Sequence, residues 1–143
     1  MPMLVPPTHR DLLATPVHGI LSTRMPDGQP QSSLVWVDYD GRHVSINTTL
    51  QRQKGRSMLA DPRISLLVVD PKNTGRWIEV RGRVVELTRA GAEAHADCLT
   101  ERYSLGRKHH FYGDVYPVGQ RRQETRVIAR IEPERIALDA VFK

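Results

Sequence analysis

The chain has 143 residues, a formal net charge of +5 and 39% hydrophobic residues, which predicts one domain spanning residues 1–143. Its apolar runs are too short to cross a bilayer, and residues 1–7 lack the pattern of a secretory signal, so we expect a cytoplasmic protein without a membrane partner. A single cysteine, Cys98, excludes an internal disulfide and is expected to pack in the core.

The positive charge predicts an anionic partner. Nucleic acid is one candidate, but aromatic residues make up only 6% of the chain, the basic residues are mostly dispersed and no nucleic-acid-binding motif is present. A phosphorylated or carboxylated small molecule explains the same charge with fewer requirements. We therefore expect no nucleic acid among the partners and keep a basic nucleic-acid-binding module as the weakest alternative.

The first third of the chain predicts a short helix and three strands joined by tight turns. Thr8 to Asp11 has the form of a capping box, and the helix that it opens should end near Ala14. Turn sequences at residues 25–28 and at Asp40-Gly41 separate the strands. The predicted strands are residues 17–24, 31–39 and 42–48.

The middle of the chain predicts a helix at residues 54–60 and an apolar strand at 64–70. Residues 76–87 then alternate, with Ile78 and Val80 on one face and Glu79 and Arg81 on the other, as in a strand between two different environments.

The last part predicts a helix at residues 88–104, capped by Thr88. Its buried stripe should contain Ala92, Ala96, Leu99 and Tyr103. A loop follows, and two final strands, 124–131 and 135–142, are expected on either side of a turn at residues 132–134.

Seven strands in hairpin order with three short helices predict a mainly β fold of the α+β class, with an antiparallel, closed or nearly closed sheet. A doubly wound nucleotide-binding fold is disfavoured, because neither of its glycine-rich phosphate-binding motifs is present. Small antiparallel barrels fill their interiors with side chains. A ligand should therefore bind outside the barrel, at a seam between subunits.

The turn between the third strand and the second helix contains three cations, Arg52, Lys54 and Arg56. The first N–H groups of a helix lack intrahelical partners, and the helix dipole adds positive potential there. A phosphate would therefore meet both backbone donors and cationic side chains. The alternative interpretation is a solvated basic turn, which the motif alone does not exclude.

Three segments, residues 18–31, 47–63 and 76–84, resemble the pyridoxamine 5′-phosphate oxidase-like proteins, and in particular their deazaflavin-dependent reductase branch. The resemblance covers about residues 8–141. It implies an FMN-binding split β-barrel and a cationic turn that holds the cofactor phosphate. In pyridoxamine 5′-phosphate oxidases the turn resembles Ser-Arg-Lys-Gly, whereas here it is Arg52-Gln53-Lys54-Gly55, which argues against pyridoxamine 5′-phosphate as the substrate.

The resemblance also implies which residues form the cofactor site. Lys54 matches the phosphate-binding lysine, and Arg52 and Arg56 match neighbouring cations of the deazaflavin branch. Other members would lie along the ring and the strand end, with Trp36 nearby and Trp77 where deazaflavin-binding relatives have a tryptophan. The full set of expected cofactor-binding residues is Ser33, Val35, Asn47, Thr48, Thr49, Arg52, Gln53, Lys54, Arg56, Ser57 and Trp77.

By the same resemblance, we expect a homodimeric oxidoreductase that transfers a hydride between a cofactor and an unidentified small organic substrate, with the site at the subunit interface. Coenzyme F420 is the first choice of cofactor because its anionic tail suits a basic cleft, and FMN is the second. The alternative is a carrier that binds the cofactor without efficient turnover. Because the cofactor performs the redox chemistry, no catalytic side chain is assigned.

The loop at residues 108–114 is the remaining candidate for chemistry. His109, His110 or Tyr112 could donate a proton to a substrate, although a packed surface loop is the preferred interpretation. Adjacent histidines without a third compact ligand do not indicate a metal. Arg81 and Arg83 either face solvent or extend the positive surface toward an acidic tail.

Overall fold

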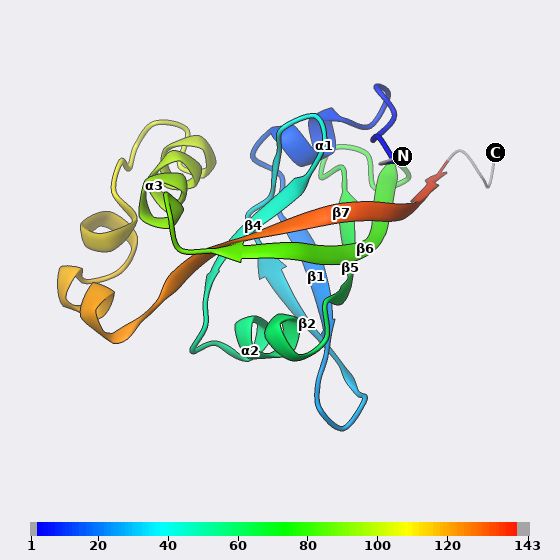
Figure 1. Ribbon diagram of the computed structural model, residues 1–143. Helices are drawn as coiled ribbons and strands as arrows, with labels where there is room; N and C mark the ends of the chain where they lie inside the picture. The colour runs from blue at the N-terminus through cyan, green and yellow to red at the C-terminus, as the bar shows by residue number, and fades with distance from the viewer. Residues whose placement is uncertain (1–2, 140–143) are drawn as a thin grey trace.

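The computed structural model describes residues 3–139. Its seven strands form a curled, antiparallel sheet in the order β2-β1-β5-β6-β7-β4-β3, consistent with a split barrel (Figure 1). The strands are β1 (Gly19–Arg24), β2 (Pro30–Val35), β3 (Asp38–Tyr39), β4 (Val44–Thr49), β5 (Arg63–Val69), β6 (Trp77–Thr88) and β7 (Arg126–Leu138). The predicted mainly β, antiparallel architecture is confirmed.

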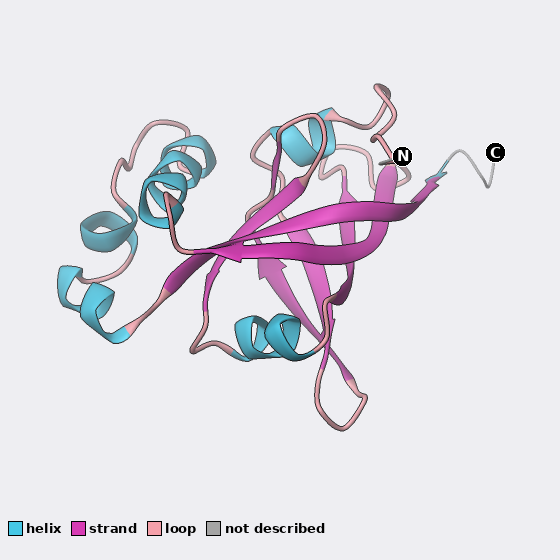
Figure 2. Ribbon diagram, viewed as in Figure 1, coloured by secondary structure: helices cyan, strands magenta, loops and turns pink. Residues whose placement is uncertain are grey.

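Helices occupy the ends of the sheet (Figure 2). They are α1 (Asp11–Ala14), α2 (Gln53–Ala60) and α3 (Ala92–Tyr103), followed by two short helical segments, η1 (Phe111–Val115) and η2 (Val118–Gln123). Helix α3 and the segments after it gather beyond the end of β6 (Figure 1), where α3 contacts β4, β7 and η1. In the described part of the chain, no helix is long and apolar enough to span a membrane.

The interior of the curled sheet is filled by aliphatic side chains. Leu21, Ile46, Leu66, Ile78 and Ile131, from five different strands, are fully buried, and burial of their apolar surface stabilises the fold. As predicted for β6, Ile78 and Val80 point inward while Arg81 is exposed. Within residues 3–139 the interior is thus occupied by packed apolar side chains, so we expect a binding site outside it.

Two predicted strand boundaries are wrong. The strand predicted at residues 31–39 is interrupted after Val35, because Trp36 joins an aromatic cluster and the N–H of Val37 donates to the hydroxyl of Tyr103 at 2.8 Å instead of to a strand. The predicted turn at residues 132–134 lies within β7, where Pro133 pairs with Gly82 and Glu134 is the extra residue of a bulge. Residues 140–142 of the predicted last strand lie outside the described residues.

Three smaller expectations are also corrected. Helix α1 begins at Asp11, and the Thr8 hydroxyl bonds the His9 ring rather than capping the helix. Thr88 is the last residue of β6, and Gly91, with φ of 74°, precedes α3 in its place. Cys98 is exposed, because it lies on the outer side of α3. Of the predicted buried stripe, Ala92, Ala96 and Leu99 are buried and Tyr103 is half-buried.

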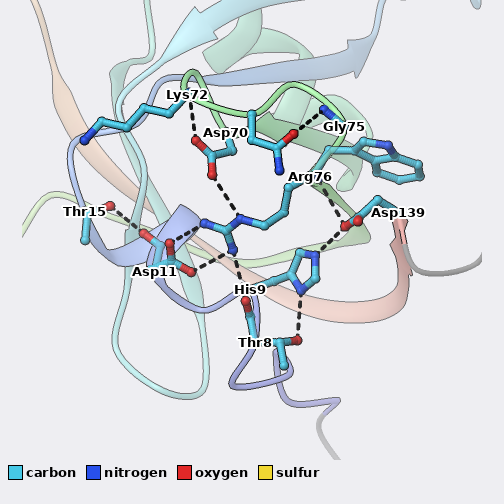
Figure 3. Close-up of polar contacts among 11 residues, drawn as sticks. Thr8, His9, Asp11, Thr15, Asp70, Lys72, Gly75, Arg76 and Asp139 are labelled. Atoms are coloured by element: carbon cyan, nitrogen blue, oxygen red, sulfur yellow. Dashed lines mark hydrogen bonds and ion pairs between the residues drawn. The ribbon is translucent and has the colours of Figure 1, made fainter. Parts of the chain in front are cut away.

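The N-terminal segment is tied to the start of β6 by charged side chains (Figure 3). The Arg76 guanidinium pairs with Asp11 at 2.6 Å and with Asp70 at 3.0 Å, and its hydrogen bond to Asp11 holds the pKa of Asp11 below its ordinary value. The buried His9 ring lies 2.6 Å from Asp139. Trp77 also belongs to this region, since its backbone N–H donates to the Asp139 carboxylate at 3.3 Å.

A second polar cluster attaches α3 to the edge of the sheet. Asp38 of β3 accepts from His95 Nε2 at 3.3 Å and from Arg102 at 2.8 Å. The other ring nitrogen of His95 accepts from Asn47 Nδ2 at 3.0 Å, which fixes the ring orientation. The hydrogen bonds from His95 and Arg102 hold the pKa of Asp38 well below its ordinary value, although partial burial opposes them.

We predict that Asp38→Asn lowers the free energy of unfolding at pH 7 by about 1–2 kcal/mol, because it removes charge-assisted hydrogen bonds that are partly exposed to solvent. A carboxylate with a lowered folded-state pKa stabilises the protein above its unfolded pKa of about 3.9 and loses that contribution as the pH falls through the folded value. Urea titrations from pH 7 down to about pH 3 should therefore show the difference from wild type shrinking below pH 4.

The exposed Asp27, in the hairpin between β1 and β2, supplies the control substitution Asp27→Asn, which should leave stability nearly unchanged. A destabilisation by Asp38→Asn that stays constant across this pH range would show that charge at Asp38 does not hold α3 to the sheet.

Candidate functional site

A pocket of about 290 Å³ opens outside the core, between β2 at one edge of the sheet, the end of β4 that β3 leaves uncovered at the other edge, and α3. Residues from β2, β4, β7, α3, η1 and the turn before α2 all reach it. The lining residues are His18, Leu34, Val35, Trp36, Asn47, Thr48, Arg52, Lys54, Ala96, Leu99, Phe111, Val115, Tyr116 and Arg126. Its volume is near the lower end of the range for small-molecule sites.

The position of Lys54 follows from an unusually close approach of α2 to the end of β4. A Cβ atom on Gly55 would lie 2.0 Å from the Thr49 carbonyl oxygen, so only glycine fits there without moving the backbone. The preceding residue, Lys54, reaches across the gap and donates from Nζ to Ser33 Oγ on β2 at 3.2 Å. Burial, and then the neighbouring Arg52, lower the pKa of Lys54, because both disfavour its positive charge.

The other two cations of the turn point in different directions. Arg52 lines the pocket with Lys54, and its guanidinium lies 5.4 Å from the ring centroid of Tyr116. Arg56 is exposed and donates to the Gln51 carbonyl oxygen and, at 2.8 Å, to Gln53 Oε1. In this structure Arg56 therefore braces the turn, while Arg52 and Lys54 face the pocket.

A third cation, Arg126, reaches the pocket from the first residue of β7. It is only 7% exposed, and it donates to Asn47 Oδ1 at 2.7 Å and to the Tyr112 hydroxyl at 3.0 Å. Glu124 lies 3.4 Å from Arg126 and 4.0 Å from Arg52. The guanidinium also lies 4.1 Å from the ring centroid of Phe111, so cation–π attraction adds to the ionic contacts. These contacts fix Arg126 as a rigid, positively charged part of the pocket wall.

The remaining walls of the pocket are apolar and aromatic. Trp36 stacks on Tyr103 with ring centroids 5.3 Å apart, and it meets Phe111 edge to face at 6.2 Å. Val35 and Leu99 are buried beside them. A flat, partly apolar surface thus lies next to a cluster of cations.

The structure brings together five of the eleven expected cofactor-binding residues as pocket lining: Val35, Asn47, Thr48, Arg52 and Lys54. Ser33 is linked to them through Lys54. Both amide atoms of Asn47 are engaged, since its nitrogen donates to the Ala92 carbonyl oxygen and its oxygen accepts from Arg126. Asn47 therefore holds the Arg126 guanidinium and the start of α3, at Ala92, in place.

The other expected residues do not line the pocket. They are Thr49, Gln53, Arg56, Ser57 and Trp77. Gln53 donates to the buried Ser57 at 3.1 Å, within α2. Trp77 lies at the start of β6, where it pairs with Val69 and contacts Asp139, and it is not among the residues that line the pocket.

The candidate proton donors and the distal arginines have other partners. His109 and His110 are exposed, near Glu101 and Asp97 respectively, and neither lines the pocket. Tyr112 is buried and donates to Glu124 at 2.7 Å, and burial raises its pKa. The exposed Arg81 and Arg83 pair with Glu79 and Glu134. Within residues 3–139, no group of three metal-ligating side chains comes together.

Sequence reasoning missed several pocket residues. Nothing in the sequence next to Arg126 indicates that it is enclosed by Asn47 and Tyr112, which are distant along the chain. His18 and the aromatic residues after α3 were missed for the same reason. The density of aromatic residues between positions 111 and 116 was the one local signal available.

The donor set fits a planar cofactor with a phosphate. Lys54 and Arg52 supply charged donors, and the buried Thr48 Oγ1 has no hydrogen-bond partner among the described residues. Val35, Trp36 and Leu99 supply the apolar walls that a ring system requires. Arg52, Lys54 and Arg126 are the charged residues that line the described pocket, so the site is electrostatically prepared for an anion.

Comparison with solved structures finds proteins of similar sequence and fold. A solved F420 reductase is 32% identical, with a TM-score of 0.78 over 93% of this chain and 98% of the other. A conserved hypothetical protein from Mycobacterium tuberculosis is 25% identical, with a TM-score of 0.70 over 96% of this chain and 85% of the other.

A heme-binding protein from Mycobacterium smegmatis is 17% identical, with a TM-score of 0.58 over 90% of this chain and 51% of the other, and shares the fold alone. No curated protein matches the chain. The family model for pyridoxamine 5′-phosphate oxidase matches residues 5–138, which is nearly the whole described chain. The chain therefore belongs to the pyridoxamine 5′-phosphate oxidase family.

Proposed function

We propose that this protein is an oxidoreductase that binds a phosphate-bearing flavin or deazaflavin between the sheet edges, with coenzyme F420 ranked above FMN. The observation that carries the proposal is the convergence of Arg52, Lys54 and Arg126 on a pocket with aromatic and apolar walls. The likeness to an F420 reductase over almost the full length of both chains supports the cofactor class.

The residues of the chain bind and orient the cofactor. Lys54 and Arg52 hold the phosphate, and the first N–H groups of α2 add donors that the N-cap side chain leaves free. Ser33 keeps the Lys54 ammonium directed toward the gap. When bound, the cofactor supplies the hydride-transfer chemistry, so the protein needs to place it and to limit access of water.

Arg126 and the aromatic cluster define the rest of the site. Asn47 and Glu124 hold the Arg126 guanidinium in place, so it presents a fixed positive charge at low reorganisation cost. Trp36 and Phe111 bound the space for a ring system. The extra positive charge beyond Lys54 is the reason for ranking the more anionic F420 above FMN.

The first prediction for this function concerns Lys54→Ala. Loss of one charge-assisted hydrogen bond to the phosphate should weaken cofactor binding by about 1.5–3 kcal/mol, or about tenfold to 150-fold in Kd, without unfolding the domain. Fluorescence titrations of FMN and F420 into wild type and variant measure the effect. The matched control is Arg56→Ala, because Arg56 braces the same turn outside the pocket and its loss should cost less affinity.

The same titrations at low and moderate ionic strength rank the two cofactors. Binding of F420 should be tighter and should weaken more steeply with added salt, since more exposed charge pairs are screened.

Equal Kd values for wild type and Lys54→Ala would remove the cationic turn from the site. Tighter binding of FMN, with similar salt dependence, would reverse the ranking.

We further propose that the protein is a homodimer with the pocket at the subunit seam. Leu34, which lines the pocket, is 68% exposed, and its cross-strand neighbour Ile20 is 39% exposed on the same outer face. A second copy covering these side chains would bury apolar surface and complete the pocket wall.

Light scattering should therefore give a mass of about twice 16.2 kDa. The substitution Leu34→Glu should shift the protein toward the monomer, because it places a charge in the proposed apolar contact. The control is Ser32→Glu on the same strand. It adds the same charge without removing a large apolar side chain, and so measures the effect of charge alone. A wild-type monomer that binds the cofactor tightly would contradict the shared-site proposal.

A further inference from the structure

A second cavity, of about 370 Å³, lies beside the first and shares three of its walls: His18, Trp36 and Val115. Residues from the end of α3 and the loop after it complete the lining. These are Thr100, Tyr103, Ser104, Leu105, Arg107 and Lys108. A molecule filling this cavity would border a molecule filling the proposed cofactor pocket.

Aromatic side chains line the second cavity on the side that it shares with the first. Trp36 and Tyr103 stack with an interplanar angle of 16°, and the His18 ring meets Tyr103 edge on at 5.3 Å. The Tyr103 hydroxyl is anchored, since it donates to the Val17 carbonyl oxygen at 2.9 Å and accepts from the Val37 N–H at 2.8 Å. Such a fixed aromatic surface favours a planar ligand.

The loop that carries the cations is preorganised. Ser104 Oγ accepts from the Lys108 N–H at 2.9 Å and donates to the Lys108 carbonyl oxygen at 3.1 Å, which closes residues 104–108 into a compact loop. Leu105 adopts a positive φ of 56°, a conformation that costs energy for a side chain of this kind. The loop thus keeps Arg107 and Lys108 at the rim of the cavity.

Arg107 and Lys108 also lack compensating charge. Neither side chain has a carboxylate within ion-pair distance among residues 3–139, whereas the nearby His109 and Arg102 pair with Glu101 and Asp38. Two unpaired cations at the rim of an aromatic cavity provide an attractive potential for an anion.

We infer that this second cavity is the substrate site and that it takes a planar, anionic small molecule, with its ring beside Trp36, which both cavities share, and its acidic group toward Arg107 and Lys108. The inference rests on the proposed function, because only an occupied cofactor pocket makes the neighbouring molecule a reaction partner. The shared walls place the two occupants next to each other, as hydride transfer requires.

Binding can be tested on the cofactor-free protein by nuclear magnetic resonance. The probes are naphthalene-2-carboxylate and the uncharged naphthalene-2-carboxamide, which share the same ring system. The chain has two tryptophans, so the indole N–H signals report two places: Trp36 in the cavity wall and Trp77 away from it. The Trp77→Phe variant assigns the two signals.

The carboxylate should shift the Trp36 signal and leave the Trp77 signal in place. It should bind about fivefold more tightly than the carboxamide, as expected for two exposed ion pairs. The double substitution Arg107→Gln/Lys108→Gln should abolish this preference. The control, Lys72→Gln/Arg81→Gln, removes the same charge from exposed sites outside the cavity and should preserve it.

Equal binding of the two probes, or an equal loss of preference in both double variants, would overturn the inference. Lower F420 affinity in Arg107→Gln/Lys108→Gln without any change in carboxylate binding would assign these cations to the cofactor tail and would equally overturn it. Because the probe titrations need no cofactor, they remain decisive if FMN and F420 fail to bind, a result that would instead contradict the proposed function.

Discussion

The contact between α2 and the end of β4 is the constraint on which the site depends. Gly55 lies so close to the Thr49 carbonyl oxygen that a Cβ atom cannot be accommodated, and this approach places the first turn of α2 at the gap between the sheet edges. Lys54 can then bridge the gap to Ser33. Without this close approach of α2 to β4, we expect the cations of the turn to face solvent, as Arg56 does.

The pocket concentrates positive charge where solvent can compensate it only partly. Arg52, Lys54 and Arg126 line it together, and Glu124 is shared between Arg52 and Arg126. The lowered pKa of Lys54, caused by burial and then by Arg52, is the electrostatic consequence. Because burial and neighbouring cations disfavour the charged Lys54 ammonium, a bound anion would stabilise it. The packing of the turn is thereby connected to the proposed binding of a phosphate.

Local sequence patterns predicted most of the architecture, because alternation, turns and helix breakers act over a few residues. They failed where contacts between residues far apart in the sequence determine where an element begins or ends. The interruption after Val35 depends on Tyr103, and the continuity of β7 through Pro133 depends on its bulged pairing with β6. In the site, the cationic turn was recognisable because Arg52, Lys54 and Arg56 lie within five residues of one another. Arg126 was not, since Asn47 and Tyr112 come to it only through the fold.

The pKa of the Lys54 ammonium tests the central claim most directly, and it can be followed by nuclear magnetic resonance of labelled lysine carbons with and without FMN. The account predicts a value below the ordinary lysine pKa of about 10.4 in the free protein, because burial and Arg52 disfavour the charged form. Binding of the anionic phosphate should raise it. An ordinary pKa that does not change when FMN binds would contradict the assignment of Lys54 to the phosphate site.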